Sequence, residues 1–344
     1  MKPTIYDVAR EAGVSIATVS KVMNNQRVGK KSKEKVLRAM EKLNYKPSVV
    51  ASALTGKQTS TIGFLLPDLA NPFIAEMARR VEDRAYERGY NLVICSTDFE
   101  PEKEAFYVSL LKQKSVDGFI IAGGFKHIEV VTQLLEEQFP VVLLGESYPS
   151  LSITSVKVDD FIGGYEVASF LLSLGHEKIA VIGEQASSSR ERIRGYEQAL
   201  QDQNLAINRK LIRITSSSNV DKVAQIAGEL LDEEAPTAIF ACNDILAIGV
   251  ILAARARNLR IPDDLSIVGF DNTFLSRSSD PPLTTVQQPI QDLCFQAFDM
   301  LVEEIKGESK YKQRVVLLPE LVVRRSTSAP PSKKASKGVE KERS

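Results

Sequence analysis

The sequence predicts a multidomain protein, in which a small all-α domain precedes a larger two-lobed α/β body with parallel sheets. Three observations predict this fold class. The length of 344 residues exceeds the roughly 250 to 300 residues at which single cores stop growing. Residues 4–44 have the pattern of three short helices with capping signals. From Thr61 onward, short apolar runs alternate with amphipathic helical stretches, as in parallel sheets covered on both faces.

The N-terminal domain, residues 1–46, is expected to contain three helices over residues 4–12, 16–24 and 32–43. Thr4 and Asp7 favour the start of the first helix, and Gly13 can end it in a left-handed conformation. Ser15 is placed to cap the second helix. A linker follows at residues 47–60 and contains one more short helical segment. A helix of only two turns is not stable in water without further contacts.

The body, residues 61–325, is expected to form its strands at the apolar runs 62–66, 92–95, 118–122, 141–144, 155–158, 179–182, 211–214, 238–242 and 266–270. The runs form two series, which predict two similar lobes with crossing segments. We expect residues 61–157 and 286–325 in one lobe and residues 158–285 in the other. Residues 326–344 are rich in Ser, Lys and Pro and lack periodicity, so they are predicted to be a disordered tail.

The charge is unevenly distributed, although the formal net charge of the whole chain is zero. Residues 1–60 contain twelve Lys and Arg against four Asp and Glu, a net of +8, and the remaining residues carry −8. Neutralising phosphates requires local positive charge, so a basic N-terminal module on an acidic body is typical of a nucleic-acid-binding domain attached to a sensor. A solvated basic face would explain the same charge without such a function.

The N-terminal residues have the spacing of a helix-turn-helix, Thr4-x-x-Asp7-Val8-Ala9-x-x-Ala12-Gly13-Val14-Ser15-x-x-Thr18-Val19-Ser20. The small and apolar positions would form the core and the turn. The second helix would then direct Ile16, Ala17, Ser20 and Lys21 outward. Ser15 and Thr18 can donate to phosphates, the apolar pair can contact thymine methyl groups, and Lys21 can donate to guanine. The alternative is that three helices pack for stability alone.

The segment TIYDVAREAGVSIATVSKVMNN closely resembles the N-terminus of the LacI/GalR family of bacterial repressors. The resemblance continues through KVLRAMEKLNYKPSVVASALTGK, GFLLPDLANPF, VDGFIIAG, DDFIGGY, LLSLGHEKIAVIG, PTAIFACND, LSIVGFDNT and PPLTTVQQP, and so covers residues 3–325. It implies a homodimer that places two recognition helices on pseudo-palindromic, double-stranded operator DNA, with hinge helices meeting in the minor groove. The DNA contacts expected from the spacing and the resemblance are Thr4, Ser15, Ile16, Ala17, Thr18, Ser20, Lys21, Asn24, Ala51 and Leu54.

Within this pattern, Leu54 matches the leucine wedge that family members insert at the central base step, which suits a hinge that orders on bent DNA. The alternative is that Leu54 packs on the body. Two positions depart from the family: Lys21 stands where many relatives have Arg, and Ser52 stands where the hinge commonly has Arg. An ammonium lacks the planar group with which arginine contacts guanine through two hydrogen bonds, so Lys21 is expected to weaken this bidentate reading of guanine.

The two-lobed body is similar to periplasmic sugar-binding proteins, which close around a ligand at the carboxyl ends of their strands. The effector-binding residues expected there are Asp68, Asn71, Phe73, Arg192, Asn243, Asp271 and Gln288. By resemblance, Arg192, Asn243 and Asp271 hold the hydroxyls or a carboxylate of a sugar or sugar derivative. Arg can bind a carboxylate through two parallel hydrogen bonds, and Asp accepts hydrogen bonds from vicinal hydroxyls. A capping or hinge role is the alternative for each. Gly145 and Glu146 stand where several relatives carry a ligand-binding Asp.

Enzyme motifs and metal sites are not expected, because the sequence lacks a Gly-x-Ser-x-Gly elbow, a Walker loop and a His-Glu-x-x-His helix. Of the two histidines, His176 is expected to have a surface or helix-capping role. The three cysteines, Cys95, Cys242 and Cys294, are expected to be buried reduced thiols. No catalytic residue, metal or cofactor is therefore assigned.

The function expected is that of a cytoplasmic, sequence-specific DNA-binding regulator, most simply an allosteric repressor controlled by a small sugar-like effector. The apolar runs fall far short of the roughly 20 residues that a membrane span needs. Two alternatives remain: a cytoplasmic sugar-binding protein, or a regulator controlled by a phosphocarrier protein partner, as in one branch of the family. A sugar-binding protein would not need the N-terminal sixty residues.

Overall fold

The computed structural model describes residues 3–23, 27–45, 58–216 and 218–331. The chain divides into two compact units, the first containing the N-terminal domain and the second nearly all of the body. The predicted hinge residues Ala51 and Leu54, together with Asn24, lie outside the described residues.

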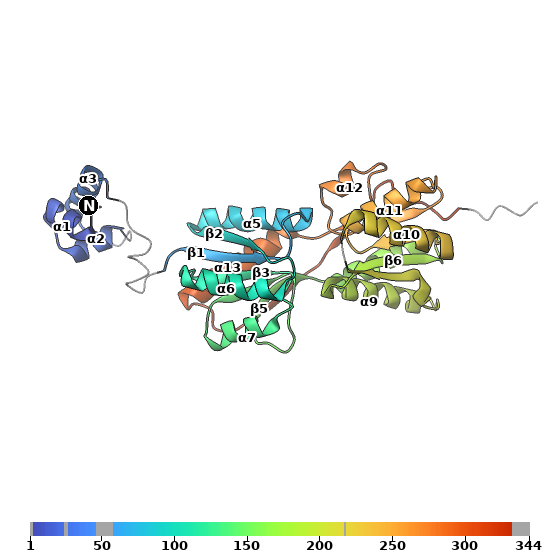
Figure 1. Cartoon of the computed structure of the whole chain (residues 1–344), viewed down its shortest axis with the longest axis horizontal. Coiled ribbons are helices and arrows are strands. Elements are labelled where there is room, and N and C mark those ends of the chain that lie inside the picture. Colours follow the sequence, from blue (N-terminus) through green and yellow to red (C-terminus); the bar gives the residue numbers. More distant parts are fainter. Residues whose placement is uncertain (1–2, 24–26, 46–57, 217, 332–344) are drawn as a thin grey trace, which may run out of the picture. The chain divides into compact units, whose positions relative to one another are not determined.

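The N-terminal domain consists of α1 (Ile5–Ala12), α2 (Ile16–Met23) and α3 (Lys30–Lys42), as the capping pattern predicts (Figure 1). Its small core contains fully buried Val8, Val19 and Val36. Gly13 adopts φ +64, the left-handed conformation that ends α1. The Thr18 backbone N–H donates to the Ser15 hydroxyl over 3.2 Å, which caps α2. The local signals in the sequence therefore specify this domain.

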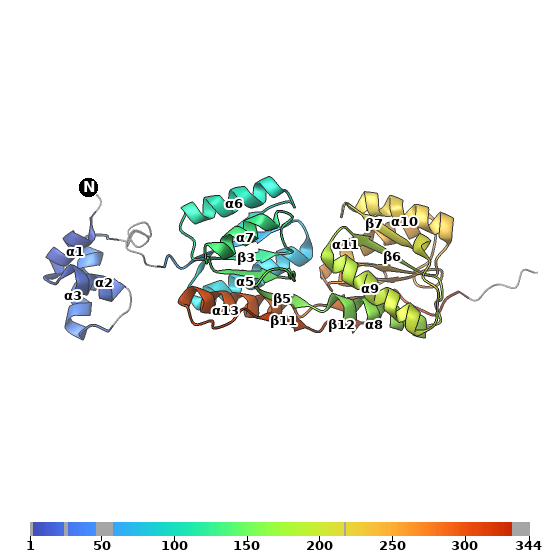
Figure 2. The ribbon, with the colours of Figure 1, turned by 90° about the horizontal axis from the view of Figure 1, so that it is seen from below.

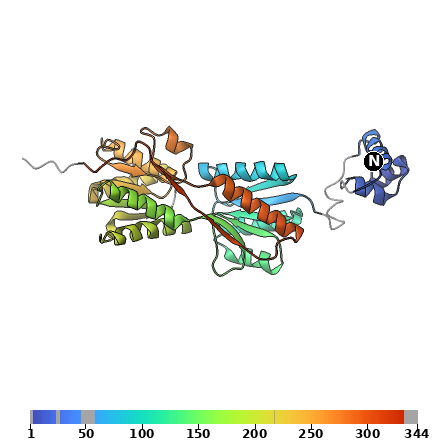
Figure 3. The same cartoon turned by 180° about the vertical axis from the view of Figure 1, so that it is seen from behind.

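The first lobe contains a six-stranded sheet in the order β11-β5-β4-β3-β1-β2. Its strands are β1 (Thr61–Leu66), β2 (Asn91–Ser96), β3 (Gly118–Ala122), β4 (Val141–Leu144), β5 (Thr154–Val158) and β11 (Arg314–Leu317). Its helices are α5 (Pro72–Arg88), α6 (Pro101–Gln113), α7 (Ile128–Glu136) and α13 (Ile290–Lys306). α5 and α13 cover one face, side by side in Figure 3, and α6 and α7 cover the other. β1, β3, β4, β5 and β11 are paired in parallel.

The second lobe contains a four-stranded parallel sheet in the order β7-β6-β8-β9. Its strands are β6 (Ile179–Glu184), β7 (Ile212–Thr215), β8 (Ala238–Ala241) and β9 (Ser266–Val268). Its helices are α8 (Asp160–Ser173), α9 (Ser187–Asp202), α10 (Val220–Glu234), α11 (Asp244–Ala256) and α12 (Phe274–Ser278). α8 and α9 pack together on one face, and α10 and α11 pack on the other (Figures 1 and 2). The predicted α/β body with parallel sheets is confirmed.

The C-terminal residues return to the second lobe instead of staying in the first. β12 (Glu320–Val322) pairs antiparallel with β10 (Thr285–Gln287), and the Arg324 guanidinium donates to the Leu283 carbonyl over 2.7 Å. Val286 of β10 lies in the core of the second lobe, so the assignment of residues 286–287 and 320–325 to the first lobe is wrong. This pairing joins residues about 35 positions apart in sequence, and no local pattern in either segment identifies its partner.

The predicted disordered tail is also wrong at its start, because residues 326–331 are ordered against the second lobe. Ser326 is fully buried and its hydroxyl donates to the Ile267 carbonyl over 2.6 Å. His176 is buried, not on the surface: its Nδ1 lies 2.8 Å from the Thr237 hydroxyl and its Nε2 lies 2.9 Å from the Ser328 carbonyl. The prediction of disorder depended on the lack of apolar periodicity. Hydrogen bonds of polar residues hold this segment in place instead. Residues 332–344 lie outside the described residues.

Candidate functional site

One face of α2 presents the predicted DNA-contacting residues. Ser15, Ile16, Ala17 and Lys21 are exposed, with Ile16 at 42%, whereas Val19 and Val22 on the opposite face are buried. Thr18 and Ser20 are half-buried, and the Thr18 hydroxyl lies 2.9 Å from the Ser15 hydroxyl. The hydroxyl of Ser15, directly before α2, is thus exposed together with the apolar side chains of Ile16 and Ala17 and the ammonium of Lys21.

The predicted contact Thr4 is exposed but already engaged at the start of α1. Its backbone N–H and its hydroxyl both donate to the Asp7 carboxylate, over 2.9 and 2.7 Å. These bonds lower the pKa of Asp7. A negative charge at a helix N-terminus is also favoured by the helix dipole, so this pair fixes the first turn of α1.

In the second lobe, a close approach of α8 and α9 positions the central ion pair. A Cβ on Gly164 would lie 1.9 Å from the Arg192 carbonyl oxygen, and one on Gly195 would lie 2.0 Å from the Phe161 carbonyl oxygen. Only glycine allows the backbones this near to each other. The approach brings Asp160, the first residue of α8, to Arg192 in the first half of α9.

Arg192 lies at the centre of a buried network. Its Nε and Nη2 are each 2.8 Å from Asp160 Oδ1, its Nη1 donates to the Cys242 carbonyl, and its guanidinium carbon lies 3.5 Å from the centre of the Phe270 ring. The Arg192 side chain is 7% exposed. Burial acts to lower the pKa of Arg192, but nearby carboxylates outweigh it, so the guanidinium stays charged. Asp160 therefore occupies the edge of the guanidinium formed by Nε and Nη2.

Asp271 is the second carboxylate at Arg192, with Oδ1 3.8 Å from Nη1. It follows β9 in a left-handed backbone conformation, φ +104, which is rare for a residue with a Cβ and is found most often at functional sites. The Gln288 amide donates to the same Oδ1 over 2.7 Å. The Asp271 side chain is 8% exposed, and burial raises its pKa well above the ordinary value despite Arg192.

Asn243 and Asp244 follow β8 and have different hydrogen-bonding roles. Asn243 caps α11 by accepting from the Leu246 N–H over 2.8 Å, and its amide donates to the Glu184 carboxylate over 3.0 Å. Burial raises the pKa of Glu184. Asp244 is fully buried and accepts from the Thr273 N–H and hydroxyl and from the Thr285 hydroxyl. Asp244 therefore links buried residues after β9 and in β10 through hydrogen bonds, and it does not cap α11.

The predicted residues of the first lobe have local roles. Asn71 caps α5 by accepting from the Phe73 N–H over 2.9 Å, Asp68 accepts from the Ala70 N–H over 2.8 Å, and Phe73 packs against the lobe's core. Contact across the lobes comes instead from Glu146, after β4, whose carboxylate accepts from the Ser187 hydroxyl at the start of α9.

We define the interlobe cluster as Glu146, Asp160, Glu184, Ser187, Arg192, Asn243, Asp271 and Gln288. The structure brings together four of the seven predicted effector residues in this cluster, those from Arg192 onward. No contact found among the described residues joins the other three, Asp68, Asn71 and Phe73, to the cluster. Sequence reasoning missed Asp160, Glu184 and Ser187. The available signal for the first two was their place near a strand end, Asp160 within DDFIGGY and Glu184 directly after LLSLGHEKIAVIG.

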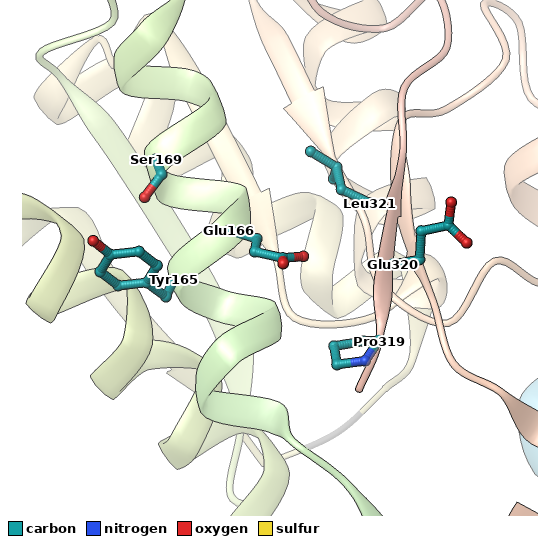
Figure 4. Close-up of a pocket in the computed structure, with 6 residues that line it drawn as sticks. All are labelled: Tyr165, Glu166, Ser169, Pro319, Glu320 and Leu321. Atoms are coloured by element: carbon teal, nitrogen blue, oxygen red, sulfur yellow. The ribbon is translucent and has the colours of Figure 1, made fainter. Parts of the chain in front are cut away.

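A separate pocket of about 410 Å³ lies on the second lobe, lined by Tyr165, Glu166, Ser169, Pro319, Glu320 and Leu321. Figure 4 shows Glu166 extending from α8 toward Pro319 and Leu321, whereas the carboxylate of Glu320 points away. None of the predicted effector residues lines it. The pocket is therefore distinct from the interlobe cluster.

Two of the three cysteines are buried as predicted, Cys242 and Cys294, and Cys95 is half-buried. Burial raises the pKa of Cys242 to about 12, which keeps it an unreactive thiol. None of the helices described is long and apolar enough to cross a membrane.

Comparisons with known proteins agree with this arrangement. Residues 4–48 match the family described as bacterial regulatory proteins, lacI family, and residues 168–327 match the periplasmic binding protein-like domain. The HTH-type transcriptional regulator DegA of Bacillus subtilis is 47% identical over 334 residues, covering 95% of this chain and 99% of that protein. The chain belongs to the LacI family of bacterial regulators. Catabolite control protein A of Priestia megaterium is a further relative, 37% identical over 95% of this chain and 100% of that protein.

Two solved structures of transcriptional regulators match this chain over nearly its whole length. The lac repressor dimer bound to operator and the anti-inducer ONPF matches with a TM-score of 0.83 and 30% identity, covering 96% of this chain and 100% of that one. The transcriptional regulator CelR–cellobiose complex matches with a TM-score of 0.72 and 28% identity, covering 94% and 99%. This LacI-family chain is thus a DNA-binding transcriptional regulator with an effector-binding body.

Proposed function

We propose that this LacI-family regulator is a homodimeric repressor that binds a pseudo-palindromic operator through α2 and responds to a small sugar-like effector at the interlobe cluster. The observation that carries the DNA-binding part is the exposed face of α2, where Ile16, Ala17 and Lys21 turn outward in a segment of net charge +8. Homodimer formation is supported by the likeness to the lac repressor dimer on its operator.

The effector-binding part is supported by the interlobe cluster. Polar side chains at the carboxyl ends of β6, β8 and β9 lie there, and Ser187 at the start of α9 donates to Glu146 of the first lobe. The carboxyl ends of the strands are where α/β sheets commonly bind ligands. A LacI-family regulator from Enterococcus faecium with bound ribose is 31% identical and matches with a TM-score of 0.69 over 78% of this chain and 99% of that one. We propose no catalytic role for the cluster, since the relatives are transcription regulators.

The proposed mechanism couples the lobes to the linker at residues 47–60. A ligand that contacts both lobes favours one lobe orientation over another, and it can shift that balance only by its differential affinity for the two states. The orientation would then change the spacing of the paired hinge segments, and with it operator affinity. Leu54, which lies outside the described residues, is proposed as the wedge at the central base step.

The test is fluorescence anisotropy of the full-length protein against a pool of short palindromic duplexes at several salt concentrations, with and without a panel of sugars. We expect salt-dependent selection of one palindrome, altered by one member of the panel. Ile16→Ala should weaken binding to that palindrome, whereas Leu37→Ala, at 49% exposure on α3, serves as the matched control. Failure to select any duplex while sugars still bind would favour a sugar-binding protein instead.

The hinge is tested separately with Leu54→Ala, which should weaken binding to the selected palindrome much more than binding to random DNA. Only the specific complex needs the bend that a wedge stabilises. Equal losses on both duplexes would contradict the wedge.

A further inference from the structure

The interlobe cluster has more negative than positive charge. Asp160 and Arg192 form a one-to-one pair, with both short contacts made to Asp160 Oδ1. Asp271 also lies near Arg192, which leaves Glu146 and Glu184 without a contact to a cation of the cluster, and Arg192 is the only cation among the residues that define the cluster. Glu184 is held by the uncharged amide of Asn243, and Glu146 by the Ser187 hydroxyl and the Ser147 N–H. An incoming anion would therefore meet carboxylates whose charge is only partly compensated.

Two oxygen atoms of the cluster can accept further hydrogen bonds. Asp271 Oδ1 receives Gln288 and lies near Arg192, but among the described residues no donor reaches Asp271 Oδ2. Gln288, 6% exposed, donates through its amide nitrogen, and no donor in the described part of the chain reaches its side-chain oxygen. Carboxylate and amide oxygens accept hydrogen bonds, so a ligand that supplies O–H or N–H groups can bind to these two atoms.

The arginine that the family pattern offers to an anionic ligand is already paired with two carboxylates of the protein, Asp160 and Asp271. Arg192 directs its Nε and Nη2 at Asp160, its Nη1 at the Cys242 carbonyl and its flat face at Phe270. Asp160 occupies the edge formed by Nε and Nη2, so a ligand carboxylate could bind that edge only by breaking the contacts with Asp160, which is itself 6% exposed. Leaving that buried carboxylate unpaired is unfavourable.

From these observations, and resting on the proposed function of the cluster as the effector site, we propose that the effector is a polyol without an anionic group and that a protonated amine on it strengthens binding. Glu184 and Glu146 are the side chains that set this charge preference, one from each lobe. Phosphorylated and carboxylated sugars are rejected.

The experiment titrates the full-length protein by calorimetry with matched sugars that differ only in charge: glucose, glucosamine, glucuronate and glucose 6-phosphate, and the corresponding galactose and mannose series. For any skeleton that binds, we expect the amine to bind most tightly and both anionic members to bind at least tenfold more weakly than the neutral sugar. Glu184→Gln should reduce the advantage of the amine several-fold while binding of the neutral sugar changes less. Glu166→Gln, outside the cluster, is the control and should leave all affinities unchanged.

Each outcome separates the charge preference from the proposed function. Anionic members that bind as tightly as the neutral sugar, or more tightly, would overturn the charge preference and leave sugar sensing in place. An unchanged amine advantage in Glu184→Gln would remove Glu184 from the account. If no skeleton binds in any charge form while the same preparation still selects a palindromic duplex, both the polyol effector and this proposal are wrong, and only the DNA-binding part stands.

Discussion

Replacing Asp160 by alanine should destabilise the body far more than a typical surface change, because it leaves the Arg192 guanidinium buried without its main partner. Arg192 is 7% exposed and makes both of its 2.8 Å carboxylate contacts with Asp160 Oδ1. Breaking a buried pair by removing one partner costs about 3–5 kcal/mol. Asp271, 3.8 Å away, keeps part of the attraction, so we expect a value near the lower end, about 3 kcal/mol.

The assay is urea unfolding of the full-length protein followed by circular dichroism, with thermal unfolding beside it. For a domain of this size, about 3 kcal/mol corresponds to a fall in Tm of roughly 6–12 °C. Asp159→Ala is the matched control, since the neighbouring Asp159 only caps α8 by accepting from the Ile162 N–H, which is worth about 1 kcal/mol. Asp160→Asn should fall between the two. If Asp160→Ala costs no more than Asp159→Ala, the account of Arg192 as an internally neutralised cation is refuted.

Two further changes test the close packing and the buried carboxyl groups. Gly195→Ala should destabilise the body by several kcal/mol and weaken sugar binding, because its Cβ would meet the Phe161 carbonyl at 2.0 Å and force α8 and α9 apart; a change below about 1 kcal/mol would contradict this packing. Burial raises the pKa of Asp244 from 3.8 to about 6, so the folded state binds the proton more tightly than the unfolded chain. The contribution of Asp244 to stability is therefore present below about pH 4 and lost as pH rises to 6, by about 3 kcal/mol. Unfolding of wild type and Asp244→Asn across this window should diverge by that amount, and parallel curves would contradict the shift.

The local features of the fold were predictable from the sequence. Capping residues and the left-handed Gly13 define the N-terminal helices, and the alternation of apolar runs with amphipathic stretches locates the strands of both lobes within a few residues. Each of these signals is read over a few neighbouring positions, where short-range sterics and periodicity dominate.

The contacts that build the site were not predictable in the same way. Arg192 was expected to offer its fork to a ligand, but Asp160, 32 residues earlier, occupies it, and nothing in either local pattern indicates the pair. His176 and Ser328 meet across 152 residues, which places a polar histidine and a Ser-rich segment inside the protein. Both examples depend on long-range hydrogen bonds between polar residues. The pattern of hydrophobic residues along the sequence does not indicate such bonds.

The central claim is that ligand binding at the interlobe cluster and operator binding by α2 are energetically coupled. The most direct test measures the operator affinity of the full-length protein by anisotropy with and without a saturating sugar that binds, and the affinity for that sugar by calorimetry with and without the operator. Coupling must be reciprocal, so the two ratios of dissociation constants should be equal and differ from one, typically by about 5- to 150-fold. A sugar that binds tightly while both ratios stay at one would contradict the account.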